Sequence, residues 1–182
     1  NKYAEKIEIL SGVEIGLQPS SIDKGNEFME GTSYDFVIMS AHTVNDMELH
    51  EELYYKDINS LGALERYYNS IYTCIKEFNN YNVVGHLDYI DRYIPETHGM
   101  PSFNEYSLMV ESVLELIIIN GKGIEINTSG LRYGLGTFHP KIEILKLYKE
   151  LGGEIITIGS DAHNPQDIGH GYDTAINVLK EL

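Results

Sequence analysis

The sequence predicts an α/β fold in which a mostly parallel sheet is covered by helices. Two observations lead to this class: short apolar runs alternate with longer stretches at helical spacing, and the runs are as apolar as strands buried between helix layers. A third concerns domain number. The 182 residues contain no repeat, low-complexity tract or linker-like change of composition, so residues 1–182 fit a single domain. An open doubly wound sheet and a barrel both satisfy this alternation, and both place function at the carboxyl ends of the strands.

The expected elements follow in chain order. Strands are predicted over residues 7–15, 35–40, 82–84, 123–126 and 154–158. Helices are predicted over residues 61–78, 104–119, 140–151 and 174–182. The first helix is the clearest, because apolar residues such as Leu61, Leu64 and Tyr68 fall on one face at helical spacing. Gly152 and Gly153 would end the third helix.

The net charge and the cysteine content limit which binding partners and which cellular compartment are expected. The formal net charge is −15, from 28 acidic and 13 basic residues, which disfavours binding to nucleic acid. No apolar run approaches the ~18 residues of a membrane span, so no membrane partner is expected. Cys74 is the single cysteine, so no disulfide can form within the chain and a reducing, cytoplasmic location is predicted.

Side chains able to bind a metal or to move a proton stand at the ends of the predicted strands. Asp161 and His163 are two residues apart, so in an extended chain they point to the same side. The full set of such residues is Glu14, His42, His86, Asp88, Asn127, Asp161 and His163.

Each of these residues has an ordinary explanation when taken alone. A lone histidine after a strand is usually a loop residue, Glu14 could pair with a lysine, and Asp161 could cap the next segment. Together, imidazoles and carboxylates at successive strand ends suit zinc, manganese or iron, and a carboxylate among imidazoles can bridge two metals. The pattern therefore predicts a metal-dependent hydrolase, with a cation-binding scaffold without turnover as the alternative. The remaining histidines are interpreted as ordinary loop residues: His50, His98, His139 and His170.

Five motifs, in this order and spacing, resemble the PHP (polymerase and histidinol phosphatase) superfamily, and within it the histidinol-phosphate phosphatase branch. They are G-V-E-I-G, S-A-H, G-H-L-D-Y-I-D-R-Y, E-I-N-T-S-G-L-R and I-T-I-G-S-D-A-H. The resemblance runs from about Val13 to the end of the chain. It implies a distorted barrel of about seven βα units, with two or three divalent metals (zinc, manganese or iron) at its carboxyl-end rim.

The resemblance also implies roles for particular residues. The metal ligands would be Glu14, His42, His86, Asp161 and His163. Glu14 and Asp161 would act in catalysis, Glu14 as a bridging carboxylate and Asp161, or a neighbouring histidine, as the acid that protonates the leaving alcohol. Arg92 and Arg132 would bind the substrate phosphate, because a guanidinium fork matches phosphate oxygens.

The implied activity is hydrolysis of L-histidinol phosphate to L-histidinol and phosphate, a step of histidine biosynthesis. Two alternatives stay open at this point. One is a PHP phosphoesterase that acts on another monoester or on a nucleic-acid end, although the negative charge counts against polymer substrates. The other is a non-catalytic module that uses the PHP fold for assembly.

The sequence departs from this family at its start, because no H-x-H pair occurs in it. The family begins with such a pair on its first strand, and a barrel of this type needs on the order of 250 residues. We therefore expect a partial (β/α)7-type barrel whose first units are missing. Such a fragment would have an incomplete metal site, weak activity on its own, and an exposed sheet edge through which it could associate.

Overall fold

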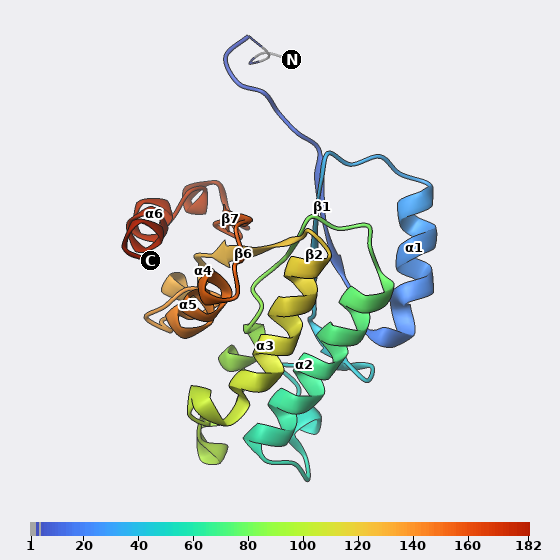
Figure 1. The fold of residues 1–182 in the computed structure, drawn as a ribbon, viewed down its shortest axis with the longest axis vertical. Coiled ribbons are helices and arrows are strands. Elements are labelled where there is room, and N and C mark those ends of the chain that lie inside the picture. The colour runs from blue at the N-terminus through green and yellow to red at the C-terminus, as the bar shows by residue number, and fades with distance from the viewer. Residues whose placement is uncertain (1–2, 4) are drawn as a thin grey trace.

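The computed structural model describes residue 3 and residues 5–182, and its centre is a parallel five-stranded sheet (Figure 1). The strand order is β1-β2-β5-β6-β7, and each neighbouring pair runs parallel. The strands are β1 Gly12–Gly16, β2 Phe36–Ser40, β5 Val83–Val84, β6 Gly123–Asn127 and β7 Ile156–Gly159. All five predicted strands are thus confirmed. Strand β1 is shorter than expected, because its pairing with β2 begins at Gly12 and residues 7–11 form no regular structure.

The helices that cover this sheet include the four that were predicted. The α-helices are α1 Ile22–Glu30, α2 Ser60–Glu77, α3 Phe103–Ile119, α4 Ser129–Arg132, α5 Ile142–Glu150 and α6 Tyr172–Glu181. Helices α1 and α4 were not expected. Helix α1 contains Gly25 and is mostly polar, which weakens its helical signal, and α4 is a single turn.

Shorter elements connect the strands and helices. Strands β3 Thr43–Val44 and β4 Met47–Glu48 form a hairpin whose two turn residues, Asn45 and Asp46, both have positive φ angles. This geometry is the one that two-residue hairpin turns favour. The 3-10 helices are η1 Pro19–Ser21, η2 Glu52–Tyr55, η3 Tyr89–Arg92, η4 Glu96–His98 and η5 Pro165–Asp167.

The apolar core lies between the sheet and its helices. Figure 1 shows α2 and α3 side by side, with α5 beside them and α1 beyond the β1 edge. Strand β6 points Ile124 and Ile126 into this core, and both are fully buried. Because side chains alternate along a strand, Glu125 and Asn127 point to the opposite face. That opposite face therefore carries polar groups, and it is where a site can form.

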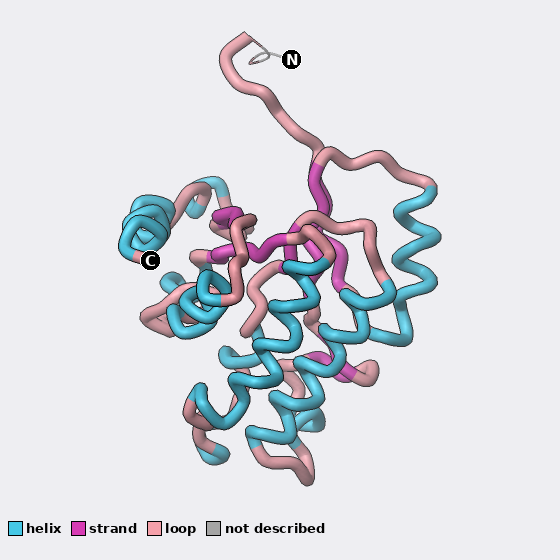
Figure 2. Tube along the Cα trace, in the orientation of Figure 1, coloured by secondary structure: helices cyan, strands magenta, loops and turns pink. Residues whose placement is uncertain are grey.

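The sheet has two outer strands, β1 and β7, so the described part of the chain does not close into a barrel (Figure 2). Just before β1, Ile7, Ile9 and Leu10 are each about 60% exposed. Separately, none of the helices among the described residues combines the length and the apolar character needed to cross a membrane.

Candidate metal centre

Three side chains from three neighbouring strands meet at the carboxyl end of the sheet. Glu14 lies on β1, His42 follows β2, and His86 follows β5. Their ligand atoms all lie within 4.8 Å of one another. The His86 Nε2 atom is 3.1 Å from Glu14 Oε1 and 3.2 Å from His42 Nε2, and His42 Nε2 is 3.5 Å from Glu14 Oε1. The parallel register brings these residues together, since neighbouring strands end at the same edge.

The chemistry of this group fits a divalent cation. The His42 and His86 Nε2 atoms face each other, and two lone pairs at this distance need a proton or a cation between them. One carboxylate oxygen and two imidazole nitrogens are ligands that zinc, manganese and iron accept. The three side chains therefore could hold a metal ion, although their role as ligands stays a prediction.

Electrostatics keep two of these groups in the protonation state that metal binding needs. The hydrogen bond with His86 lowers the pKa of Glu14 to about 2, and this outweighs the opposite effect of burial. Burial, followed by the nearby His86 charge, lowers the pKa of His42. An ionised carboxylate and a neutral imidazole are the forms that bind metals, so these shifts favour the metal-binding forms of Glu14 and His42.

These three residues line a cavity of about 640 Å³ that also includes Asp161 and His163. The Asp161 side chain is 20% exposed and adds to the electrostatic environment of His42. The His163 side chain is 79% exposed, and its Nδ1 atom lies 3.1 Å from the Asp161 carbonyl oxygen. The structure thus places all five predicted ligands around one cavity, but only Glu14, His42 and His86 form a close group among the described residues.

Arg92 lines the same cavity and is held between two aromatic rings. Its guanidinium carbon lies 4.1 Å from the ring centre of Tyr133 and 4.7 Å from that of Tyr89. One nitrogen donates to Ser129 Oγ at 3.1 Å. A guanidinium stacked in this way keeps a fixed orientation and still has donors for an anion. Tyr89 and Tyr133 were not identified from the sequence, although Tyr89 belongs to the 3-10 helix that carries Arg92.

Arg132 is placed differently from its predicted role. It is not among the described residues that line the cavity. Its two terminal nitrogens donate to the carbonyl oxygens of Ser160 and Asp161, at 2.5 and 2.7 Å. Its Nε atom lies 4.0 Å from an Asp167 carboxylate oxygen. These contacts fit a residue that holds the Asp161 segment in place, and phosphate binding by Arg132 stays a prediction that its donors do not favour.

Replacing Arg132 with methionine should loosen the Asp161 segment. Two hydrogen bonds from a charged group would be lost, which we expect to lower the free energy of unfolding by about 1–3 kcal/mol. Urea unfolding would measure this loss, and hydrogen exchange would show faster exchange in residues 159–168. The exposed Arg66 on α2 offers a matched Arg66→Met control, which should change neither quantity. Equal behaviour of the two variants would contradict a holding role for Arg132.

Three other residues differ from their interpretation in the sequence. His139, taken as an ordinary loop residue, is buried, and its Nδ1 atom lies 2.6 Å from Asp88 Oδ1. Asp88 also accepts a hydrogen bond from the Lys141 backbone nitrogen at 2.8 Å, so it points away from the metal centre. Asn127 accepts from the Ser129 backbone nitrogen and donates to Glu125, which makes it a structural residue at the start of α4.

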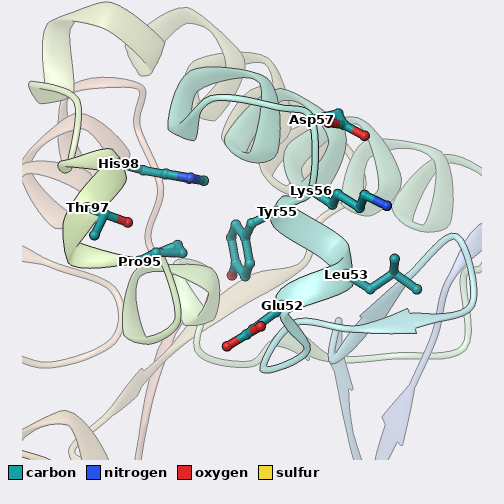
Figure 3. Close-up of a pocket in the computed structure, with 8 residues that line it drawn as sticks. All are labelled: Glu52, Leu53, Tyr55, Lys56, Asp57, Pro95, Thr97 and His98. Carbon is teal, nitrogen blue, oxygen red and sulfur yellow. The ribbon is translucent and has the colours of Figure 1, made fainter.

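A second hollow lies away from the metal centre, between η2 and η4 (Figure 3). It has a volume of about 580 Å³, and the Tyr55 and His98 rings meet edge to face inside it. None of the predicted ligands lines it. The catalytic chemistry is therefore expected at the strand ends and not in this second hollow.

Comparison with known proteins agrees with the fold. The family model of the PHP domain matches residues 2–129. The chain is 32% identical to the "Probable histidinol-phosphatase" of Clostridium acetobutylicum, over 99% of this chain and 70% of that protein. It is also 32% identical to the histidinol-phosphatase of Lactococcus lactis subsp. lactis, over 89% of this chain and 60% of that protein.

A solved structure matches the same fold. It is the crystal structure of histidinol phosphate phosphatase from Lactococcus lactis in complex with zinc, L-histidinol and phosphate. The TM-score is 0.81 at 28% sequence identity, and the match covers 99% of this chain and 68% of that one. The chain thus spans between about three fifths and seven tenths of the length of these relatives.

Proposed function

The chain belongs to the PHP domain family, and we propose that it carries the catalytic face of a metal-dependent histidinol phosphatase. The reaction is hydrolysis of L-histidinol phosphate to L-histidinol and inorganic phosphate, as a step of histidine biosynthesis. The observation that carries this proposal is the close group of Glu14, His42 and His86 in a cavity that also presents Arg92. The names of the relatives and the zinc, histidinol and phosphate in the Lactococcus structure support it.

Different residues of the cavity would take different roles in phosphate ester hydrolysis. Glu14, His42 and His86 would hold the metal, with Asp161 and His163 completing its ligands from the facing loop. Bound divalent ions would supply positive charge for the phosphoryl oxygens and would lower the pKa of the attacking water. We propose two or three such ions, of zinc, manganese or iron.

Arg92 and Asp161 would act on the substrate itself. Arg92 would bind phosphoryl oxygens and offset the charge that develops on them, with its guanidinium held by Tyr89 and Tyr133. Asp161 would give a proton to the leaving alcohol, whose alkoxide is otherwise a poor leaving group. Glu14 would act as the carboxylate shared between ions.

Charge also favours a small cationic substrate over a polymer. The chain carries a net charge of −15, and Glu48 and Asp161 add carboxylates to the cavity wall. The amino and imidazole groups of histidinol phosphate suit such surroundings, whereas a nucleic acid would be repelled. The cytoplasmic location predicted from the single cysteine is consistent with this role and remains a proposal.

A phosphatase assay tests the proposed function directly. The protein would be assayed in a form that includes the strands present in its relatives, with histidinol phosphate and with other phosphate monoesters, after removal of metals and again after addition of zinc or manganese. The 182-residue chain alone should show only weak activity. We expect phosphate release only with metal added, and fastest with histidinol phosphate. A clear preference for another monoester would favour the alternative PHP phosphoesterase. Metal binding without turnover, in a protein that includes the strands present in its relatives, would favour the non-catalytic module.

The unpaired edge of β1 is proposed as a contact surface. Ile7, Ile9 and Leu10 are exposed beside it, and a strand edge with apolar neighbours tends to pair with another chain. Light scattering after size-exclusion chromatography should show concentration-dependent association that Ile9→Lys reduces. Leu108→Lys, at another exposed apolar site, on α3, is the control. A monomer at all concentrations would rule out this contact.

A further inference from the structure

Glu125 is a buried carboxylate directly behind the metal centre. It lies in the middle of β6 and is 5% exposed, on the face of the sheet opposite the apolar core. Its Oε2 atom accepts a hydrogen bond from the backbone nitrogen of His86 at 3.3 Å and another from Asn127 Nδ2 at 3.2 Å. Among the described residues, the close ligand group does not include it. The hydrogen bond from His86 to this buried carboxylate comes from the His86 backbone and not from its imidazole. A buried carboxylate in this place calls for an explanation.

The backbone of His86 explains why a hydrogen bond is needed there. His86 has a φ angle of +26°, in a region that residues other than glycine rarely occupy. Such a conformation persists only where the surrounding structure holds it. The His86 peptide is held on both sides, because its nitrogen donates to Glu125 and its carbonyl oxygen accepts from the Tyr89 nitrogen at 2.8 Å.

We propose that Glu125 is a positioning residue that holds the His86 backbone in this conformation and so turns the imidazole toward Glu14 and His42. The proposal rests on the proposed function, since it assigns Glu125 to the support of the same metal centre. Glu125 acts through His86 and makes no contact with the substrate. Its contribution is to fix the ligand before the metal arrives, which lowers the entropy lost on binding.

The surroundings of Glu125 fix the carboxylate in turn. Asn127 donates to it and is itself held by the Ser129 backbone nitrogen at 3.0 Å. Gly159, on the neighbouring strand β7, leaves the space that the carboxylate fills, and a Cβ atom at this position would overlap Glu125 Oε1. A glycine at 159 is therefore required by the side chain of Glu125, even though its own φ angle is ordinary.

On the other side of the cavity, a second predicted ligand also has a positive φ angle and a backbone held by a side chain. Asp161 has a φ angle of +49°, and its carbonyl oxygen and that of Ser160 accept hydrogen bonds from Arg132. Two predicted ligands with left-handed backbones are thus each held by a buried or half-buried charged side chain. This parallel supports a positioning role for Glu125 over a role in core packing alone.

Two substitutions at one position separate hydrogen bonding from packing and charge. Glu125→Gln keeps a side-chain oxygen that can accept from the His86 nitrogen, whereas Glu125→Leu keeps the approximate volume and loses the acceptor. Zinc affinity would be measured by competition with a chromophoric chelator. We expect Leu to weaken zinc binding by about 10- to 100-fold and Gln to retain most of the affinity. Glu115→Gln, on the exposed face of α3, is the matched control and should have no effect.

Hydrogen exchange of the metal-free protein gives a second readout that does not depend on zinc. The His86 amide should exchange faster in Glu125→Leu than in the wild type, and close to the wild-type rate in Glu125→Gln. If the Leu variant fails to fold, Gly159→Ala displaces the carboxylate without removing it and should reproduce both effects.

The outcomes distinguish this proposal from the proposed function. Equal losses of zinc affinity in the Gln and Leu variants would assign the effect to charge and overturn the positioning role. Wild-type zinc affinity and wild-type exchange in the Leu variant would overturn it as well. A wild-type chain that binds no zinc would count against the metal centre itself, and the exchange of the His86 amide would then decide the positioning role alone.

Discussion

Replacing Lys141 with methionine should lower the free energy of unfolding at pH 8 by about 3–5 kcal/mol, because it leaves buried, ionised carboxylates without their cation. The Lys141 Nζ atom forms an ion pair with Asp91 and donates to the Tyr106 hydroxyl at 2.7 Å. Both side chains of the ion pair are less than one fifth exposed. Burial acts to lower the pKa of Lys141, but the charges of Asp91 and Asp88 outweigh it and raise that pKa. The Lys141 side chain therefore keeps its positive charge, and its removal should lower the stability of the folded state.

The loss of stability in Lys141→Met should increase as the pH rises. Burial and the nearby Asp88 charge raise the pKa of Asp91 to about 7. In the folded state Asp91 thus keeps its proton at a pH where the unfolded chain has lost it, so its contribution to stability falls as pH rises from about 4 to 7. Without Lys141 this pKa would rise further. The deficit of Lys141→Met relative to wild type should therefore be larger at pH 8 than at pH 5.

Urea unfolding at the two pH values would measure both effects. Lys146→Met, on the exposed face of α5, is the matched control and should change stability by less than about 0.5 kcal/mol. Adding Asp91→Asn to Lys141→Met removes the uncompensated charge and should restore part of the loss. No recovery in the double variant would mean that packing against Tyr106, and not charge, accounts for the effect.

The contacts of Asp88 and Asp91 with Lys141 also explain how Arg92 is positioned at the cavity. Asp88 is the N-cap residue of η3, and Asp91 lies within this 3-10 helix, directly before Arg92. Asp88 binds the Lys141 backbone nitrogen, and Asp91 binds the Lys141 side chain. The segment that presents Arg92 is thus tied to the start of α5, a distant part of the chain. Stability and the geometry of Arg92, which we propose to bind phosphate, therefore share one set of contacts.

Sequence patterns predicted the elements whose signal is local. The five strands fall on short, mainly apolar runs, and helices α2, α3, α5 and α6 show apolar residues at helical spacing. Glu14, His42 and His86 could be placed at one rim because parallel strands end at the same edge. Helix α1 was missed because Gly25 and its polar neighbours dilute the helical pattern.

Contacts between distant residues could not be predicted in the same way. The Asp88–His139 pair joins residues 51 positions apart, and the hydrogen bond from His86 to Glu125 joins residues 39 apart. Motif spacing does not encode such pairs, so His139 was taken as an ordinary loop residue and Glu125 as part of a strand. Arg132 was assigned to phosphate by its motif, whereas its donors face backbone carbonyls that only the folded chain brings near.

Replacing Asp161 with asparagine should lower kcat for histidinol phosphate by at least about 100-fold while the fold stays intact. Asparagine has nearly the same shape, and it tolerates the positive φ angle that Asp161 adopts better than most residues do. The backbone contacts from Arg132 do not involve the substituted side chain. The change therefore removes from the cavity the carboxyl that is proposed to bind metal or to protonate the leaving alcohol, without disturbing the loop.

Steady-state kinetics with added zinc or manganese, together with urea unfolding, would check this prediction. The exposed Asp173, in the first turn of α6, gives a matched Asp173→Asn control that should keep wild-type turnover. If Asp161 acts mainly as the proton donor, a substrate whose leaving group needs no proton, such as a nitrophenyl phosphate, should be hydrolysed with a much smaller loss. If it acts mainly as a metal ligand, both substrates should lose activity alike and zinc affinity should fall. Unchanged turnover of both substrates would remove Asp161 from the site.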